Sequence, residues 1–226
     1  MLPDIAFLAE VMGRLLPGVP LTLTLASLSV GTGAVLALLL ALLRASSRAG
    51  SAVVRAYVFV LRGSPLLVQL FLIYYGLSQF PAIRQSVLWP FLRQPFWCAI
   101  LALSLNTAAY GSEIIRGGLR AVPPGPVEAA RALGLSGARL YGLVILPLAL
   151  RQALPAYGNE VVIMVKSTAL ASVVTLMELT GIAHDIIGET FRAFEVFLCA
   201  GAIYLALNAV IARGVTLLER RLSPGV

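Results

Sequence analysis

Two charged side chains, Glu160 and Lys166, stand alone in a stretch of the chain that is otherwise uncharged from residue 152 to residue 177. If this stretch crosses a membrane, each charge costs roughly 3 kcal/mol unless a cavity, a partner or a cation compensates it. Glu160, with Asn159 beside it, could therefore bind a cationic substrate. An ion pair with Lys166 would need a broken helix, because a spacing of six residues turns the two side chains apart. Substrate binding, a structural role and gating all remain open for Glu160.

Catalytic and metal-binding chemistry is not indicated by the sequence. Lys166 and Ser167 match the last two residues of a phosphate-binding loop, but that loop needs glycines where this chain has Glu160 and Val165. His184 is the single histidine, and no Cys or carboxylate set around it has the spacing of metal ligands. No nucleophile with a matching base can be assigned. We expect no enzyme activity, no bound metal and no cofactor on this chain.

The elements that position these residues must lie in a membrane. Of the 226 residues, 59% are hydrophobic and 12% are charged, and the mean hydropathy is +0.93. A water-soluble domain of this size could not bury so much apolar surface. Long uncharged intervals leave room for crossings of roughly 17–25 residues each. We predict an all-α integral membrane protein, a single transmembrane domain over residues 1–226, with five helices at about Pro20–Leu43, Gly63–Phe80, Phe96–Ile115, Leu154–Met177 and Val196–Leu217.

Arginines gather in alternate connections between these helices, which sets the expected orientation. Positive residues concentrate on the cytoplasmic side of a membrane protein, so the N-terminus is expected outside and the C-terminus in the cytoplasm. The net charge of +7 follows from this bias and does not indicate nucleic acid binding. The cytoplasmic set is Arg44, Arg48, Arg55, Arg116, Arg120, Arg131, Arg139, Arg151, Arg213, Arg220 and Arg221.

A segment rich in small residues, Glu128 to Gly134, lies between the third and fourth predicted crossings. Prolines before it and Pro147 after it predict a free-standing helix over Val127–Leu140, roughly 20 Å long. On that helix Ala130, Gly134 and Ala138 would form a stripe almost without side chains, which would let a partner come close.

This segment resembles the EAA loop of ABC importer permeases. The resemblance rests on Glu128, Ala129 and Ala130, on Gly134 four residues later, and on the following Val-x-Leu-Pro at residues 144–147. It implies a cytoplasmic coupling loop at about residues 121–147, in which a helix docks into a groove of a separate ATPase.

Three further segments are similar to the polar amino acid permeases within that family. They are Arg-Gly-Ser-Pro-Leu-Leu-Val-Gln at residues 62–69, Ala-Tyr-Gly-Ser-Glu-Ile at residues 109–114, and Asn159-Glu160 with Lys-Ser-Thr-Ala-Leu at residues 166–170. The last is closest to the histidine and opine permeases. The similarity covers about Pro17 to Arg221, and it implies the type I ABC importer permease fold.

The family resemblance also implies a function and a set of partners. The chain would form half of the translocation path for a polar, in this branch basic, amino acid or derivative in the inner membrane of a bacterium. Its partners would be an ABC ATPase dimer that binds ATP and Mg, a second permease subunit, an extracytoplasmic solute-binding protein, the substrate and membrane lipid. The alternatives are a proton-coupled secondary transporter, which would use Glu160, Asp185 or His184, and a membrane assembly subunit without transport.

Overall fold

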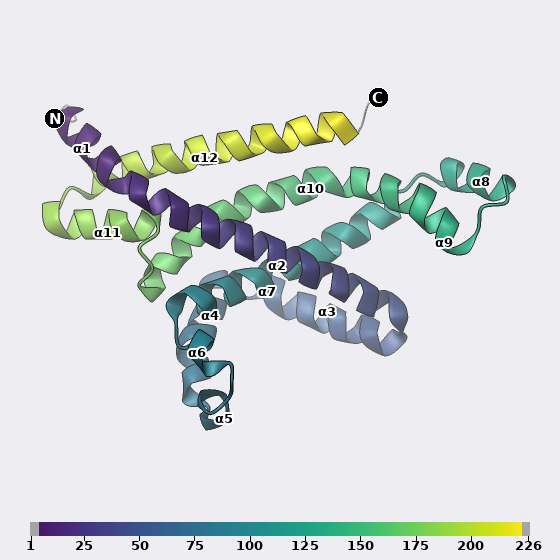
Figure 1. Cartoon of the computed structure of the whole chain (residues 1–226), viewed down its shortest axis with the longest axis horizontal. Helices are drawn as coiled ribbons and strands as arrows, with labels where there is room; N and C mark the ends of the chain where they lie inside the picture. Colours follow the sequence, from purple (N-terminus) through teal and green to yellow (C-terminus); the bar gives the residue numbers. More distant parts are fainter. Residues whose placement is uncertain (1–4, 223–226) are drawn as a thin grey trace.

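The computed structural model describes residues 5–222, and all regular elements within that range are helices. Four long helices run along the longest axis of the molecule (Figure 1). Each is long and apolar enough to cross a membrane, and a bent helix pair raises the number of candidate crossings to five. The long helices are α2 (Val19–Ser46), α7 (Pro95–Arg120), α10 (Leu146–Ser167) and α12 (Ala193–Leu222).

Helices α2 and α7 pack most extensively, because small residues let their backbones approach each other. A Cβ atom added at Gly33 would lie 1.9 Å from Cγ2 of Thr107, so only glycine fits there. One turn further along the same helix pair, a Cβ atom on Gly111 would lie 2.9 Å from Cβ of Ala37. Helices α3 and α10 pack against this pair.

The N-terminal helix α1 (Ile5–Leu15) continues through a short 3-10 turn, η1 (Leu16–Gly18), into α2 as one rod of 42 residues. Its side chains Val11 and Leu15 are buried against α11 (Leu179–Thr190) and the start of α12. Figure 1 shows α1, α11 and the beginning of α12 gathered at one end of the molecule.

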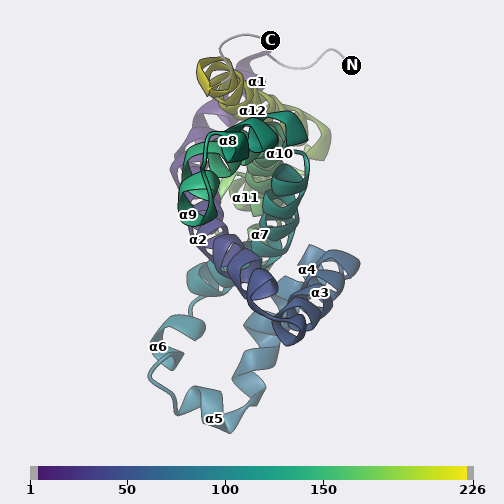
Figure 2. The ribbon, with the colours of Figure 1, turned by 90° about the vertical axis from the view of Figure 1, so that its right-hand side faces the viewer.

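The second predicted crossing, Gly63–Phe80, is not a straight helix. Helix α3 (Arg48–Gly63) ends at a break that Ser64 and Pro65 form, and the helical turns up to Gln79 are bent away from it by 105°. The break at Gly63 and Pro65 was expected, but the sharp bend was not. The elements beyond the break are α4 (Leu66–Phe71), the π segment η2 (Leu72–Gly76), η3 (Leu77–Gln79), α5 (Pro81–Arg84) and α6 (Trp89–Leu92). In Figure 2 α5 and α6 project away from the bundle.

The fourth predicted crossing begins earlier than expected, because Pro147 does not interrupt the helix. Residues Gly137–Val174 form one continuous helical span of 38 residues, in which the π segment η4 (Tyr141–Ile145) leads directly into α10. Proline cannot donate a backbone hydrogen bond and normally breaks a helix. A local π turn absorbs that defect here, since it changes the pairing of N–H and carbonyl groups next to Pro147. The span ends in the 3-10 segment η5 (Thr168–Val174).

A fully buried carboxylate, Glu178, joins the end of this span to three other elements. It caps α11 by accepting hydrogen bonds from the backbone N–H groups of Thr180 and Gly181, both at 2.9 Å. The hydroxyl of Tyr204 on α12 donates to it at 2.8 Å, and that of Thr22 on α2 donates at 3.5 Å. Because four donors surround it, Glu178 fixes the relative positions of α2, α11 and α12.

Candidate functional site

The segment between α7 and α10 forms two short helices instead of one. Helix α8 (Pro124–Ala132) starts directly after Pro123 and has proline in its first turn. Proline suits that place, because its fixed φ is helical and the first N–H groups have no partner within the helix. The prolines therefore separate α8 from α7, as predicted, and also begin it.

Gly134 ends α8 in a left-handed conformation with φ of +86°. Its N–H donates to the carbonyl of Arg131 at 2.9 Å, and the N–H of Leu135 donates to that of Ala130 at 3.0 Å. This pair of bonds is the Schellman pattern, which glycine forms without strain. The predicted continuous helix over Val127–Leu140 is therefore wrong, since a second helix, α9 (Gly137–Leu140), starts after the turn. The stripe of Ala130, Gly134 and Ala138 does not form.

The residues of the predicted coupling segment separate into an exposed set and a buried one. Glu128, Ala129 and Gly134 are exposed, and a Cβ atom added at Gly134 would meet nothing within 4 Å. Ala130 is only 6% exposed, because α8 packs against α9 and η4. Leu133, which was not among the predicted contact residues, is 83% exposed beside the turn. A large apolar residue directly before a helix-ending glycine is the signal that could have identified it.

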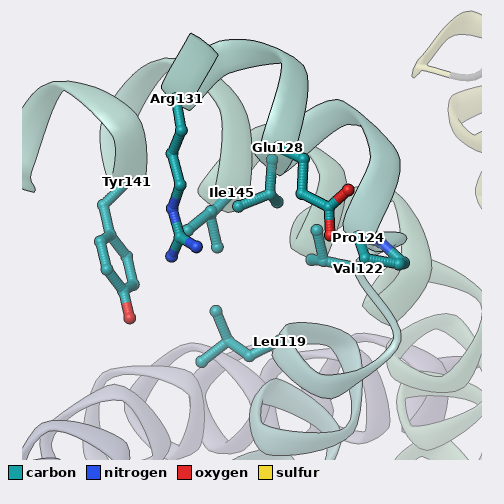
Figure 3. A pocket seen from close by; sticks show the side chains of 8 residues that line it. Leu119, Val122, Pro124, Glu128, Arg131, Tyr141 and Ile145 are labelled. Carbon is teal, nitrogen blue, oxygen red and sulfur yellow. The ribbon is translucent and has the colours of Figure 1, made fainter. Parts of the chain in front are cut away.

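A pocket of about 330 Å³ lies beneath α8, between the end of α7 and η4 (Figure 3). Leu119 of α7 and Ile145 of η4 provide apolar walls. The side chain of Arg131 points into the space between Tyr141 and Ile145 (Figure 3). The carboxylate of Glu128 is directed toward Pro124 on the other side of the pocket (Figure 3). Helices α8 and α9, which flank the turn, lie at the end of the molecule opposite α11 (Figure 1).

A second pocket, also of about 330 Å³, lies where the break between α3 and α4 meets α7 and α10. Glu160 lines it and is 6% exposed. Thr107 of α7 donates a hydrogen bond from its hydroxyl to Oε1 of Glu160. The other polar residues that line this Glu160 pocket are Ser64, Asn106, Tyr110 and Ser167. Helices from three distant parts of the sequence thus surround one buried carboxylate.

The side-chain amide of Gln69 connects the end of α3 to α7 next to this pocket. Its Nε2 donates to the carbonyl of Leu61 at 2.7 Å and to that of Ser64 at 3.0 Å. Asn106 donates from Nδ2 to Oε1 of Gln69 at 3.0 Å. A helix end leaves carbonyl groups without partners, and Gln69 satisfies them at the end of α3. The break at Pro65 is therefore a stabilised part of the fold, and it faces Glu160.

Asn159, predicted beside Glu160, is exposed and does not line this pocket. Successive residues on a helix point about 100° apart, so Asn159 and Glu160 face different directions. Lys166 is also exposed and does not line it. The structure instead brings Glu160 together with Asn106 and Tyr110. Asn106 and Tyr110 are four residues apart and therefore share one face of α7. Once Asn106 is known to line the pocket, this spacing predicts that Tyr110 lines it too.

The comparisons with known proteins agree on one class. The family model described as binding-protein-dependent transport system inner membrane component matches residues 33–224. The octopine transport system permease protein OccM of Rhizobium meliloti is 57% identical over 98% of this chain and 91% of that protein. The histidine/lysine/arginine/ornithine transport system permease protein HisM of Escherichia coli (strain K12) is 44% identical over 86% of this chain and 82% of that protein.

The same class appears among solved structures. A crystal structure of an amino acid ABC transporter with histidines contains a chain that superposes with a TM-score of 0.86 at 38% identity. The match covers 98% of this chain and all of that one. The fold is thus shared over the whole length of the described bundle.

Proposed function

Because this chain belongs to the family of binding-protein-dependent transport system inner membrane components, which are permease subunits of ABC importers, we propose that it moves a basic amino acid or an opine. The observation that supports this substrate class is Glu160, a buried carboxylate in a polar pocket whose hydrogen-bond partner is a neutral hydroxyl. A basic substrate would provide the cation that offsets the cost of that buried charge. The family supports this importer over the proton-coupled alternative.

The names of the relatives support the same substrate class. One is named for octopine and another for histidine, lysine, arginine and ornithine. Octopine and arginine share a guanidinium cation, and lysine and ornithine carry an ammonium group. A carboxylate at Glu160 would suit each of these cations. Asn159, which is exposed, would contribute only if substrate or the second subunit reached that face of α10.

The exposed surface of α8 and the turn at Gly134 is the proposed contact with the ATPase. Glu128, Ala129 and Leu133 would face the ATPase, while Gly134 sets the path of the chain between α8 and α9. ATP and Mg would bind to the ATPase dimer, and this chain would supply one of two docking segments. A second permease subunit completes the path, and a solute-binding protein delivers substrate on the other side of the bacterial inner membrane.

We expect arginine uptake by proteoliposomes that contain the permease, a second permease subunit, the ATPase and the solute-binding protein. Uptake should require internal ATP and should continue when a proton gradient is collapsed with an ionophore. Radiolabelled arginine measures it, and omission of the ATPase is the control. Uptake that followed the proton gradient without ATP would contradict the proposal.

Single cysteines test the proposed orientation, after the native Cys98 and Cys199 have been replaced. We expect cysteine at Ala138 of α9 to label only from the cytoplasm and cysteine at Asp185 of α11 to label only from outside, since these helices lie at opposite ends of the molecule (Figure 1). Both residues are exposed. A third cysteine, at Gln85, should also label from outside if the bent arm crosses the membrane.

Membrane-impermeant maleimide on intact cells and on inverted vesicles gives the measurement. Labelling of Ala138 and Asp185 positions from the same side would contradict the orientation. Labelling of the Gln85 position from the cytoplasm would show that the bent arm does not cross the membrane, and it would contradict the model with five crossings.

A further inference from the structure

A positive charge stands beside the Glu160 pocket without a carboxylate partner. Arg62 is in the last turn of α3 and is exposed. Its guanidinium carbon lies 4.7 Å from the centre of the Tyr110 ring, and Tyr110 lines the pocket. Tyr110 therefore connects the guanidinium of Arg62 to the pocket that Glu160 lines. Among the residues that the structure describes, neither Arg62 nor Glu160 is in a salt bridge.

The environment of Arg62 explains how the cation keeps its place without an anion. A guanidinium over an aromatic face is attracted by the ring electrons. The C-terminus of α3 also favours a positive side chain, because the helix dipole is negative there. A guanidinium has five N–H donors, and its attraction to a ring does not use them as hydrogen bonds to an acceptor would. Other arginines of this chain, such as Arg44 and Arg192, use such groups to bind a carboxylate of the protein.

The Glu160 pocket thus has an anion on α10, and the cation at the end of α3 lies beside it, over the ring of the lining residue Tyr110. A free amino acid has the complementary pair, a carboxylate and at least one cationic group. The pocket volume of about 330 Å³ is at the lower end of the range for small-molecule sites, which suits such a ligand.

We propose that Arg62 binds the α-carboxylate of the substrate while Glu160 binds its cationic group. The inference rests on the proposed function, and it adds the requirement for a carboxylate to the preference for a cation. A guanidinium can donate two parallel hydrogen bonds to a carboxylate, which an ammonium or an amide cannot reproduce. Arg62 is thereby a specificity-determining residue. A ligand that has the cationic group but lacks the α-carboxylate should bind more weakly.

Direct binding to the purified complex of permease and ATPase tests this role, without the solute-binding protein and its own selectivity. The probes are L-arginine and agmatine, which is arginine without its carboxylate. We expect the wild-type complex to bind arginine at least about tenfold more tightly than agmatine, as the loss of a charge-assisted pair would give. Arg62→Gln should lower this preference to within about twofold by weakening arginine alone. Arg62→Lys should restore part of it.

Arg55→Gln is the matched control, because Arg55 is also an exposed arginine of α3 and donates to Ser51 Oγ at 2.8 Å, away from the pocket. It should keep the wild-type preference. An unchanged ratio of the two affinities in Arg62→Gln would overturn the role of Arg62, and so would an equal loss of both affinities, which a structural role predicts. A wild-type complex that bound neither probe would overturn the proposed substrate class itself.

Discussion

Uptake should fall at least about fivefold when Gly134 is replaced by leucine, while the permease still inserts and pairs with its second subunit. Gly134 has φ of +86°, a conformation that costs a residue with a Cβ atom roughly 1–2 kcal/mol. Space is not the obstacle, since an added Cβ atom would meet nothing within 4 Å. The strain would instead favour another path between α8 and α9 and displace Leu133 from the proposed ATPase contact. ATP hydrolysis and arginine uptake are measured in the same proteoliposomes. Hydrolysis should continue while uptake falls.

Two further variants separate the effect of the backbone conformation at residue 134 from the effect of side-chain size. Gly134→Asn should keep most of the uptake, because asparagine tolerates the left-handed region better than other residues with a side chain. Gly125→Ala is the matched control within the same segment, since its Cβ atom would also meet nothing within 4 Å and its φ is not positive. Wild-type uptake in Gly134→Leu would contradict the coupling role. Equal losses in Gly134→Leu and Gly134→Asn would show that the side chain obstructs the contact.

Replacing Glu160 by glutamine should reduce transport of a cationic amino acid at least about tenfold and leave transport of a neutral one nearly unchanged. Glutamine keeps the size and the ability to accept the hydrogen bond from Thr107, but it removes the charge. A charged hydrogen bond contributes roughly 1.5–3 kcal/mol, which corresponds to a ten- to hundredfold change. Arginine and glutamine uptake by the same proteoliposomes provide the comparison. Basal ATP hydrolysis and assembly should remain as in the wild type.

Glu10→Gln is the control for loss of a carboxylate as such, because Glu10 is exposed on α1. It should leave both substrates unaffected. If Glu160→Gln lowered the uptake of both amino acids equally, or prevented assembly, Glu160 would have a structural role and not a role in substrate binding.

Apolar runs and breakers were enough to predict much of the fold. The charge-free intervals identified α2, α7 and α12 closely, because a membrane crossing needs about 20 apolar residues whatever surrounds it. The break at Gly63 and Pro65 was also predicted, since neither residue favours a helix interior. The angle of 105° beyond it was not, because packing against α7 and the bond network of Gln69 determine that direction.

Local context explains the two errors in the coupling segment. A spacing of four suggested one helix through Gly134, but glycine is also the commonest residue at a helix end, and the turn was preferred. Pro147 suggested a helix end, but the π segment before it accommodated the missing N–H. In each case one residue type supports two structures, and the sequence nearby does not decide between them.

The Glu160 pocket was only half predictable for a different reason. Glu160 itself stood out as a charge in an apolar run. Its neighbours Thr107 and Tyr110 belong to α7, and Ser64 belongs to the break after α3. Such contacts between distant segments follow from tertiary packing, which residue spacing within one segment does not reveal.

The packing of α1 against α12 also has a consequence for how the protein is made. Leu8 and Cys199, which meet in this cluster, are 191 residues apart in the chain. At about 5–20 residues per second, the ribosome needs on the order of ten seconds or more to complete that interval. The apolar face formed by Val11 and Leu15 therefore stays uncovered until synthesis is nearly finished. A nascent chain that stops before α12 would present this face to chaperones and quality-control proteases.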